Sequence, residues 1–385
     1  MVPELIYRDP TADVTSRVAD LLGRMTLAEK LAQLGSYWSH EILDHEVFDE
    51  AKASELIGLG IGQITRVAGA TNLGQRGAAE LANQIQHFAL ENTRLGIPVI
   101  IHEECLHGLL ARESVCFPQS LGQAAAWDPD LVREMASRLG HEIRAAGAHQ
   151  VLAPILDITR DPRWGRVEET YGEDPYLVAV LGAAYVHGLQ DAGGPTQHVI
   201  ATGKHMVGHG LPEGGLNHAP SHIGSRELAD SFLFPFEAAV REAGIRSMMH
   251  AYDDVDGLPC VASRFLLTDV LRERWGFDGM VVSDYFGVDE IIGSHRMTQD
   301  RSAAAGSTKG FSKSPSSNLA RKTRSTAAST VASGTRPDAT ASSRGPAKNL
   351  NVGNSTSTPA SSAIAAAAER SCVIRWEPMI SSTPK

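Results

Sequence analysis

The nine residues from 279 to 287, GMVVSDYFG, place an acidic side chain directly after a short apolar run. The run Met280–Val282 is typical of a buried parallel strand. Asp284 follows it, at the position where α/β barrels carry their catalytic groups. A helix N-cap or an ion-paired loop aspartate produces the same local pattern, so this segment alone leaves both interpretations open.

Four other predicted strands are also followed by polar side chains. The carboxyl ends of parallel strands in a barrel open at one mouth, so we expect these side chains to lie together there. Five neighbouring strand ends with this property are hard to explain by packing alone. The residues concerned are Glu104, Asp157, Arg166, Lys204, His205, Tyr252 and Asp284.

This set of side chains suits a polyhydroxylated ligand. Carboxylates accept hydrogen bonds from sugar hydroxyl groups, and arginine and lysine donate to them. A cation beside a carboxylate also lowers its pKa and keeps it ionised. An ionised Asp284 in such a pocket can attack an anomeric carbon as a nucleophile.

The elements that must position these side chains alternate between strand and helix from about residue 57. Six strand–helix repeats with short connections predict an α/β fold with a parallel sheet. Periodicity does not separate a closed barrel from an open doubly wound sheet, but no GxGxxG motif follows the first strand, which disfavours dinucleotide binding. The predicted strands are Ile57–Val67, Ile97–Ile101, Gln150–Ile155, His198–Thr202, Ile245–His250 and Gly279–Val282.

Start and stop signals predict where the helices lie. Two Asp-Pro pairs offer an N-cap followed by proline at the first helical position. A Thr-x-x-Glu capping box opens an N-terminal helix, and a proline interrupts a later one. The signals are Thr26–Glu29, Asp128-Pro129, Asp174-Pro175, Ser225 with a break near Pro235, and Ser263 to Trp275 closed by Gly276.

The 385-residue chain changes character near residue 296. Residues 301–385 contain 12 Lys and Arg, 3 Asp and Glu, 18 Ser, 9 Thr and 16 Ala, with few large apolar side chains. Such a segment cannot bury enough apolar surface to offset its ordering entropy. We therefore expect a domain at 1–298 and a disordered or frameshifted tail at 299–385, with at most a marginal helix at Ser361–Arg370.

Composition also bears on partners and location. The body outside the basic tail is acidic, which disfavours nucleic-acid binding. Four cysteines without CxxC spacing, no signal sequence and no long apolar run predict a cytoplasmic chain outside the membrane. His102 and His107 resemble a zinc motif with one residue too many, and no metal or cofactor is expected.

The chain resembles glycoside hydrolase family 3, which includes β-glucosidases and β-xylosidases, from about Arg8 to His295. The resemblance rests on motifs in a fixed order: DLLGRMTLAEK at 20–30, RDPRWGR at 160–166, YGEDP at 171–175, GKH at 203–205, GHG at 208–210 and VVSDYFG at 281–287.

The resemblance implies a (β/α)8 TIM-barrel-like domain, here incomplete at its C-terminal end. It implies that Asp284 is the nucleophile of a retaining reaction on a glycoside substrate. It also implies that Arg166, Lys204 and His205 hold the sugar hydroxyl groups, and that Tyr252 lies beside the nucleophile. Glu104 stands where many β-glucosidases have Asp, which favours a β-xylosidase.

One departure from the family concerns the acid/base carboxyl group that a retaining reaction needs. Most members supply it from a second domain after the barrel, and this sequence has no recognisable equivalent. We therefore expect weak or absent turnover from a truncated chain. The alternatives are a β-N-acetylhexosaminidase of the same family, which would use a His-Asp pair on the loop after Lys204-His205, and a non-catalytic sugar-binding or inactive fragment. The sequence leaves the oligomeric state open.

Overall fold

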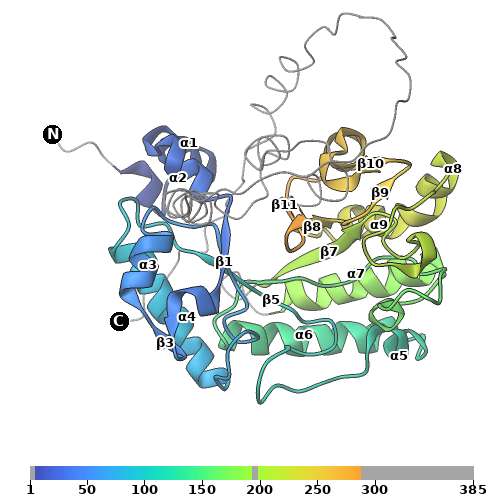
Figure 1. The fold of residues 1–385 in the computed structure, drawn as a ribbon, viewed down its shortest axis with the longest axis horizontal. Helices are drawn as coiled ribbons and strands as arrows, with labels where there is room; N and C mark the ends of the chain where they lie inside the picture. Colours follow the sequence, from blue (N-terminus) through green and yellow to red (C-terminus); the bar gives the residue numbers. More distant parts are fainter. Residues whose placement is uncertain (1–4, 193–197, 288–385) are drawn as a thin grey trace, which may run out of the picture. The chain divides into compact units, whose positions relative to one another are not determined.

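The computed structural model describes residues 5–192 and 198–287. They form a curled, seven-stranded sheet with the strand order β1-β4-β5-β6-β7-β8-β11, and helices lie along its outer side (Figure 1). Every neighbouring pair is parallel. The strands are β1 (Ser36–Trp38), β4 (Gln63–Thr65), β5 (Ile100–Glu103), β6 (Gln150–Val151), β7 (Ile200–Met206), β8 (Ser247–His250) and β11 (Met280–Val282).

The outer helices begin where the local signals predict. Asp128 accepts from the Leu131 N–H, and Asp174 accepts from the Leu177 N–H, as N-caps. The capping box at Thr26 is confirmed in both directions. The α-helices are α1 (Val14–Arg24), α2 (Leu27–Ala32), α3 (Glu50–Ile57), α4 (Gln75–Glu91), α5 (Ser120–Ala124), α6 (Pro129–Ala145), α7 (Pro175–Asp191), α8 (Ser225–Glu227) and α9 (Phe234–Arg241).

Two later helical segments are less regular than expected. A π-helical stretch at Leu228–Phe232 separates α8 from α9, and Pro235 lies in the first turn of α9, which confirms a break near this proline. The predicted helix after Ser263 is a π-helical segment over Phe265–Arg274. Two short antiparallel pairs complete the described elements: β2 (Leu43–Asp44) with β3 (Val47–Phe48), and β9 (Asp254–Val255) with β10 (Leu258–Pro259).

The first predicted strand was wrong at its start. Ile57 ends α3, and the strand begins only at Gln63. Between them, a Cβ on Gly62 would lie 2.0 Å from the Gln33 carbonyl oxygen, so the turn needs glycine there. The prediction also missed β1, because a three-residue strand that starts with serine shows no usable period.

The hydrophobic core fills the space between the sheet and its helices. Fully buried members from both layers include Ile64 and Ile101 in strands and Leu139 and Leu181 in helices. A smaller cluster of Leu152, Met249 and Val282 forms separately. Apolar packing therefore stabilises the sheet, so the buried polar side chains at its strand ends need a separate explanation.

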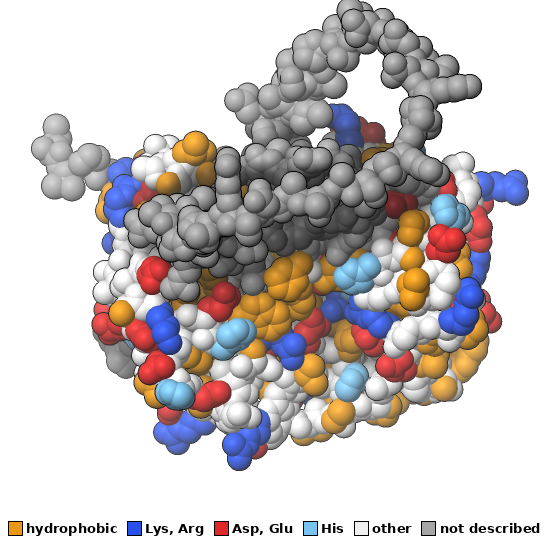
Figure 2. Space-filling model, in the orientation of Figure 1, with side chains coloured by type: hydrophobic (Ala, Val, Ile, Leu, Met, Phe, Trp, Pro, Cys, Tyr) orange, Lys and Arg blue, Asp and Glu red, His pale blue; other side chains and the backbone are white. Residues whose placement is uncertain are grey.

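On the face of the described residues that Figure 2 presents, acidic and basic side chains are interspersed. The described helices include none that is long and apolar enough to cross a membrane. Cys105, Cys116 and Cys260 are free thiols. Cys372, the predicted boundary at 298 and 299, and the predicted tail lie outside the described residues.

Candidate active site

Lys204 and Glu104 form an ion pair at the carboxyl ends of β7 and β5. Lys204 Nζ lies 2.8 Å from Glu104 Oε2. The lysine side chain is 4% exposed and that of the glutamate 18%. The sequence placed Lys204-His205 at the end of its strand, whereas β7 continues to Met206. The pair places one cation and one anion side by side at this end of the sheet.

His205 connects two acidic side chains. Its Nδ1 lies 2.8 Å from Asp157 Oδ2, and its backbone N–H donates to the same oxygen at 2.9 Å. Its Nε2 lies 3.4 Å from Asp284 Oδ2. Burial raises the pKa of Asp157 to about 7. Burial, together with the positive charge of Arg166, lowers the pKa of His205 well below its ordinary value.

Asp284 lies just past β11, which pairs with β8. It is 8% exposed, and its Oδ1 accepts from the Tyr285 N–H at 2.7 Å. The neighbouring Tyr285 ring packs 4.9 Å from the Trp38 ring at the end of β1. The two edge strands of the sheet therefore approach each other beside Asp284.

Tyr252 reaches the same point from the end of β8. Its hydroxyl donates to the Tyr285 carbonyl oxygen at 2.7 Å. Its ring stacks on His218, with centroids 4.3 Å apart and planes at 12°. Burial and the negative charge of Asp284 raise the pKa of the Tyr252 phenol. The phenol therefore remains a neutral hydrogen-bond donor beside the carboxylate.

Arg166 approaches from the loop after β6. Its Nε and Nη2 donate to the two oxygens of Glu169 at 3.0 and 2.8 Å. Its Nη2 also lies 3.3 Å from His205 Nε2. The guanidinium group lies over the Trp164 ring, 5.9 Å from its centroid. The bidentate contact fixes the plane of the guanidinium group.

These contacts bring together every residue that the sequence singled out for this pocket. Glu104 joins through Lys204, and the others link through His205, Asp284 or Tyr285. The sequence placed Asp157 at this mouth without a specific role, and in the structure it contacts and orients His205. Sequence reasoning missed Glu103, which accepts from the Ala68 and Gly69 N–H groups at 2.6 and 3.1 Å and has its pKa raised by burial to about 7.

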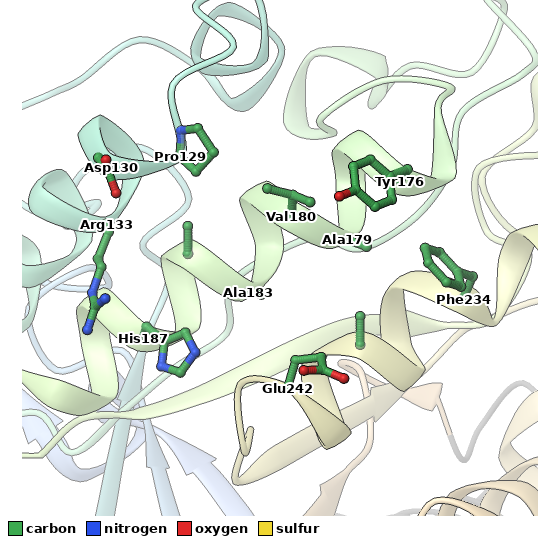
Figure 3. A pocket seen from close by; sticks show the side chains of 12 residues that line it. Pro129, Asp130, Arg133, Tyr176, Ala179, Val180, Ala183, His187, Phe234 and Glu242 are labelled. Atoms are coloured by element: carbon green, nitrogen blue, oxygen red, sulfur yellow. The ribbon is translucent and has the colours of Figure 1, made fainter.

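A separate hollow of about 410 Å³ opens between α6, α7 and α9. Figure 3 shows the side chains that line it, which include alanines and larger side chains such as Tyr176 and Phe234. It is formed by helices and not by strand ends, so it is distinct from the site around Asp284. In the described part of the chain, no group of three or more His, Cys, Asp or Glu side chains is arranged to hold a metal ion.

Two curated proteins are similar to this chain in sequence. A β-xylosidase of Formosa agariphila is 41% identical over 245 residues, which cover 61% of this chain and 34% of that protein. A periplasmic β-glucosidase of Salmonella typhimurium is 31% identical over 276 residues, which cover 71% and 34% of the two chains. The chain thus spans about a third of the length of these curated relatives.

Solved structures of two β-glucosidases are similar to this chain in fold. A β-glucosidase from Erythrobacter marinus superposes with a TM-score of 0.74 at 37% identity, covering 80% of this chain and 41% of that one. A β-glucosidase from Listeria innocua in complex with glucose gives a TM-score of 0.66 at 30% identity, covering 77% and 42%. These matches agree with the predicted α/β barrel-like fold. The model of the glycosyl hydrolase family 3 N-terminal domain matches residues 26–308, and the chain belongs to this family.

Proposed function

We propose that this chain carries the sugar-binding and nucleophilic part of a retaining exo-β-glycosidase. The substrate is a glycoside with a terminal, non-reducing β-D-xylosyl or β-D-glucosyl residue. The observation that supports this most is the line of contacts from Asp157 through His205 to Asp284. Asp284 lies 3.4 Å from His205 at the carboxyl ends of the strands, and both relatives compared above act on β-glycosides by name.

In the first step, an Asp284 oxygen forms a bond to the anomeric carbon while the bond from that carbon to the leaving oxygen breaks. A general acid gives the leaving oxygen its proton. In the second step, water attacks the same carbon, its proton passes to the conjugate base of that acid, and the bond to Asp284 breaks. Two inversions give overall retention.

The remaining side chains bind the sugar. Lys204 and Arg166 donate to hydroxyl groups, and Glu104 accepts from them. Tyr252, whose hydroxyl donates to the Tyr285 carbonyl oxygen, lies beside Asp284 and can accept from a sugar hydroxyl group. Glu104 is one methylene longer than aspartate, which leaves less room for the C6 hydroxymethyl group of a hexose. We therefore propose xylosides as the preferred substrates.

The acid/base carboxyl group is not among these side chains. Glu104 is engaged by Lys204, and Asp157 is fully enclosed behind His205. Neither can meet a leaving group. The proposal therefore places the acid/base outside the described residues, as in family members that take it from a second domain.

The test uses 2,4-dinitrophenyl β-D-xyloside and β-D-glucoside, whose leaving group barely needs protonation. We expect the purified chain to release dinitrophenol, faster from the xyloside, and Asp284→Ala to abolish release. Glu104→Asp should shift the preference toward the glucoside. A wild-type chain that melts cooperatively yet releases nothing from either sugar would refute the proposal.

Two alternatives are separated by the same assay. Faster release from the corresponding N-acetylglucosaminide would support a β-N-acetylhexosaminidase. Saturable binding of xylose or glucose without any release would support a sugar-binding chain. His209 is fully buried, which disfavours a general-acid role for that histidine in the loop after β7.

A further inference from the structure

His209 and Asp253 form a second buried acid–imidazole pair beneath Arg166. Both side chains are fully buried, and His209 Nδ1 lies 3.5 Å from Asp253 Oδ1. His209 lies just past β7, and Asp253 directly follows Tyr252. The mechanism proposed above gives neither residue a role, although the His209 ring lies only 4.6 Å from that of His205.

The contacts of Arg166 indicate how His209 and Asp253 can influence this guanidinium group. A guanidinium group has five N–H donors and no acceptor. Among the described residues, Glu169 takes two of these donors and His205 is within reach of a third. Arg166 Nη1 lies 3.3 Å from His209 Nε2, which accounts for a fourth. One N–H, on Nη1, is left for a ligand.

The same contacts define the tautomer of His209. Because Arg166 can only donate, Nε2 of His209 must present its lone pair to Nη1. A neutral imidazole then carries its proton on Nδ1, on the side of Asp253. Neither carboxylate oxygen of Asp253 nor His209 Nδ1 makes a hydrogen bond among the described residues, and Oδ1 and Nδ1 face each other at 3.5 Å. The carboxylate is thus placed to hold His209 in the tautomer that accepts from Arg166.

We propose that His209, oriented by Asp253, is a positioning residue that fixes the direction of the remaining N–H on Arg166 Nη1. That N–H donates to a hydroxyl group of the bound sugar. The inference rests on the proposed glycosidase function, because it assigns the contact to the sugar of that reaction. His209 itself touches no substrate.

Two substitutions separate this role from simple packing. In His209→Gln, the side-chain amide reaches the level of Nε2 and keeps an acceptor for Arg166. In His209→Asn, the amide reaches only the level of Nδ1, so the acceptor is lost. With dinitrophenyl xyloside, we expect Asn to raise KM about tenfold with kcat changed less than about threefold, and Gln to stay near wild type. Equal losses in both variants, or a loss confined to kcat, would overturn the proposal.

A spectroscopic measurement needs no turnover. Long-range ¹⁵N–¹H spectra report the tautomer of each imidazole, and His209→Gln identifies the His209 signals by their disappearance. We expect the ring proton on Nδ1, on the side of Asp253. A proton on Nε2, or a doubly protonated ring, would overturn the proposal. If the tautomer is as expected but dinitrophenyl glycosides are not hydrolysed, the glycosidase function fails while the Arg166–His209 contact stands.

Discussion

The two ends of the sheet interior both contain buried polar side chains, but of different kinds. At the amino ends of the strands, Gln150 Nε2 donates to Thr202 at 2.9 Å and to Ser247 at 3.1 Å. Its Oε1 accepts from Gln63 at 3.2 Å. At the carboxyl ends lie ionisable groups instead. Buried Asp253 there has no hydrogen-bond partner for its carboxylate among the described residues.

The difference separates stability from function. The neutral groups at the amino ends bind one another, so they stabilise the fold and have little capacity left for a ligand. The ionisable groups at the carboxyl ends keep donors and acceptors that a ligand can use. This division agrees with the general placement of chemistry in α/β barrels.

Removal of Asp284 should have the largest effect. Asp284→Ala should lower the hydrolysis of dinitrophenyl xyloside by at least about 10⁴-fold, because in the proposed mechanism only Asp284 forms a bond to the sugar. Azide should restore release and give an α-glycosyl azide, since a single inversion replaces two. Asp269→Ala, which removes an exposed partner of Arg264, is the matched control and should retain activity. A fully active Asp284→Ala variant would show that Asp284, at the carboxyl ends of the strands, does not carry out the reaction.

Removal of Lys204 should rank second. Lys204→Met leaves Glu104 without its cation in a partly buried position, and we expect kcat/KM to fall about 10²- to 10³-fold. Lys52 supplies the contrast, because it pairs with Asp44 at 3.6 Å on the exposed surface. Lys52→Met should change kcat/KM by less than about twofold. Similar losses in the two variants would mean that the Lys204 pair has no special place in the site.

At the amino ends, Gln150→Ala should cost stability and leave catalysis intact. It leaves the hydroxyl groups of Thr202 and Ser247 with one donor fewer, and we expect the free energy of unfolding to fall by about 1–3 kcal/mol. Urea unfolding measures this change. A kcat/KM that falls more than about threefold, in a variant of unchanged stability, would show that the two ends are not separate.

The smallest expected effect concerns Asp157 and His205. Their titration makes the free energy of unfolding depend on pH. The folded-state pKa of Asp157 is raised from 3.8 to about 7 by burial, so its contribution is present at low pH and lost as pH rises through 7. The folded-state pKa of His205 is lowered from 6.5, so its contribution is present above 6.5 and lost as pH falls. Between pH 3.8 and 6.5 the two slopes oppose each other.

Asp157→Asn removes the first contribution and exposes the second. From pH 6.5 to pH 5, the free energy of unfolding of the variant should fall more steeply than that of wild type, by up to about 1.4 kcal/mol per pH unit. Urea titrations at several pH values test this difference. Parallel curves for the two proteins would show that Asp157 does not titrate with a raised pKa in the folded state.

Local signals explain which parts could be predicted from sequence. The caps at Asp128 and Asp174 act within three residues, so neighbouring residues in the sequence determine where each helix begins. Asp284 was predictable because an apolar run marked the strand before it. β1 was not, because its three residues become a strand only through pairing with β4. The pairing of His209 with Asp253 is likewise a contact between loops after different strands, which no local pattern records.

The most direct test of the account is covalent trapping of Asp284. A 2,4-dinitrophenyl 2-deoxy-2-fluoro-β-D-xyloside should form the glycosyl bond rapidly and lose it slowly. Mass spectrometry should then show an added fluoroxylosyl group on the peptide that contains Asp284, and none in Asp284→Ala. An unlabelled wild-type chain, or a label on another side chain, would contradict the assignment of Asp284 as the nucleophile.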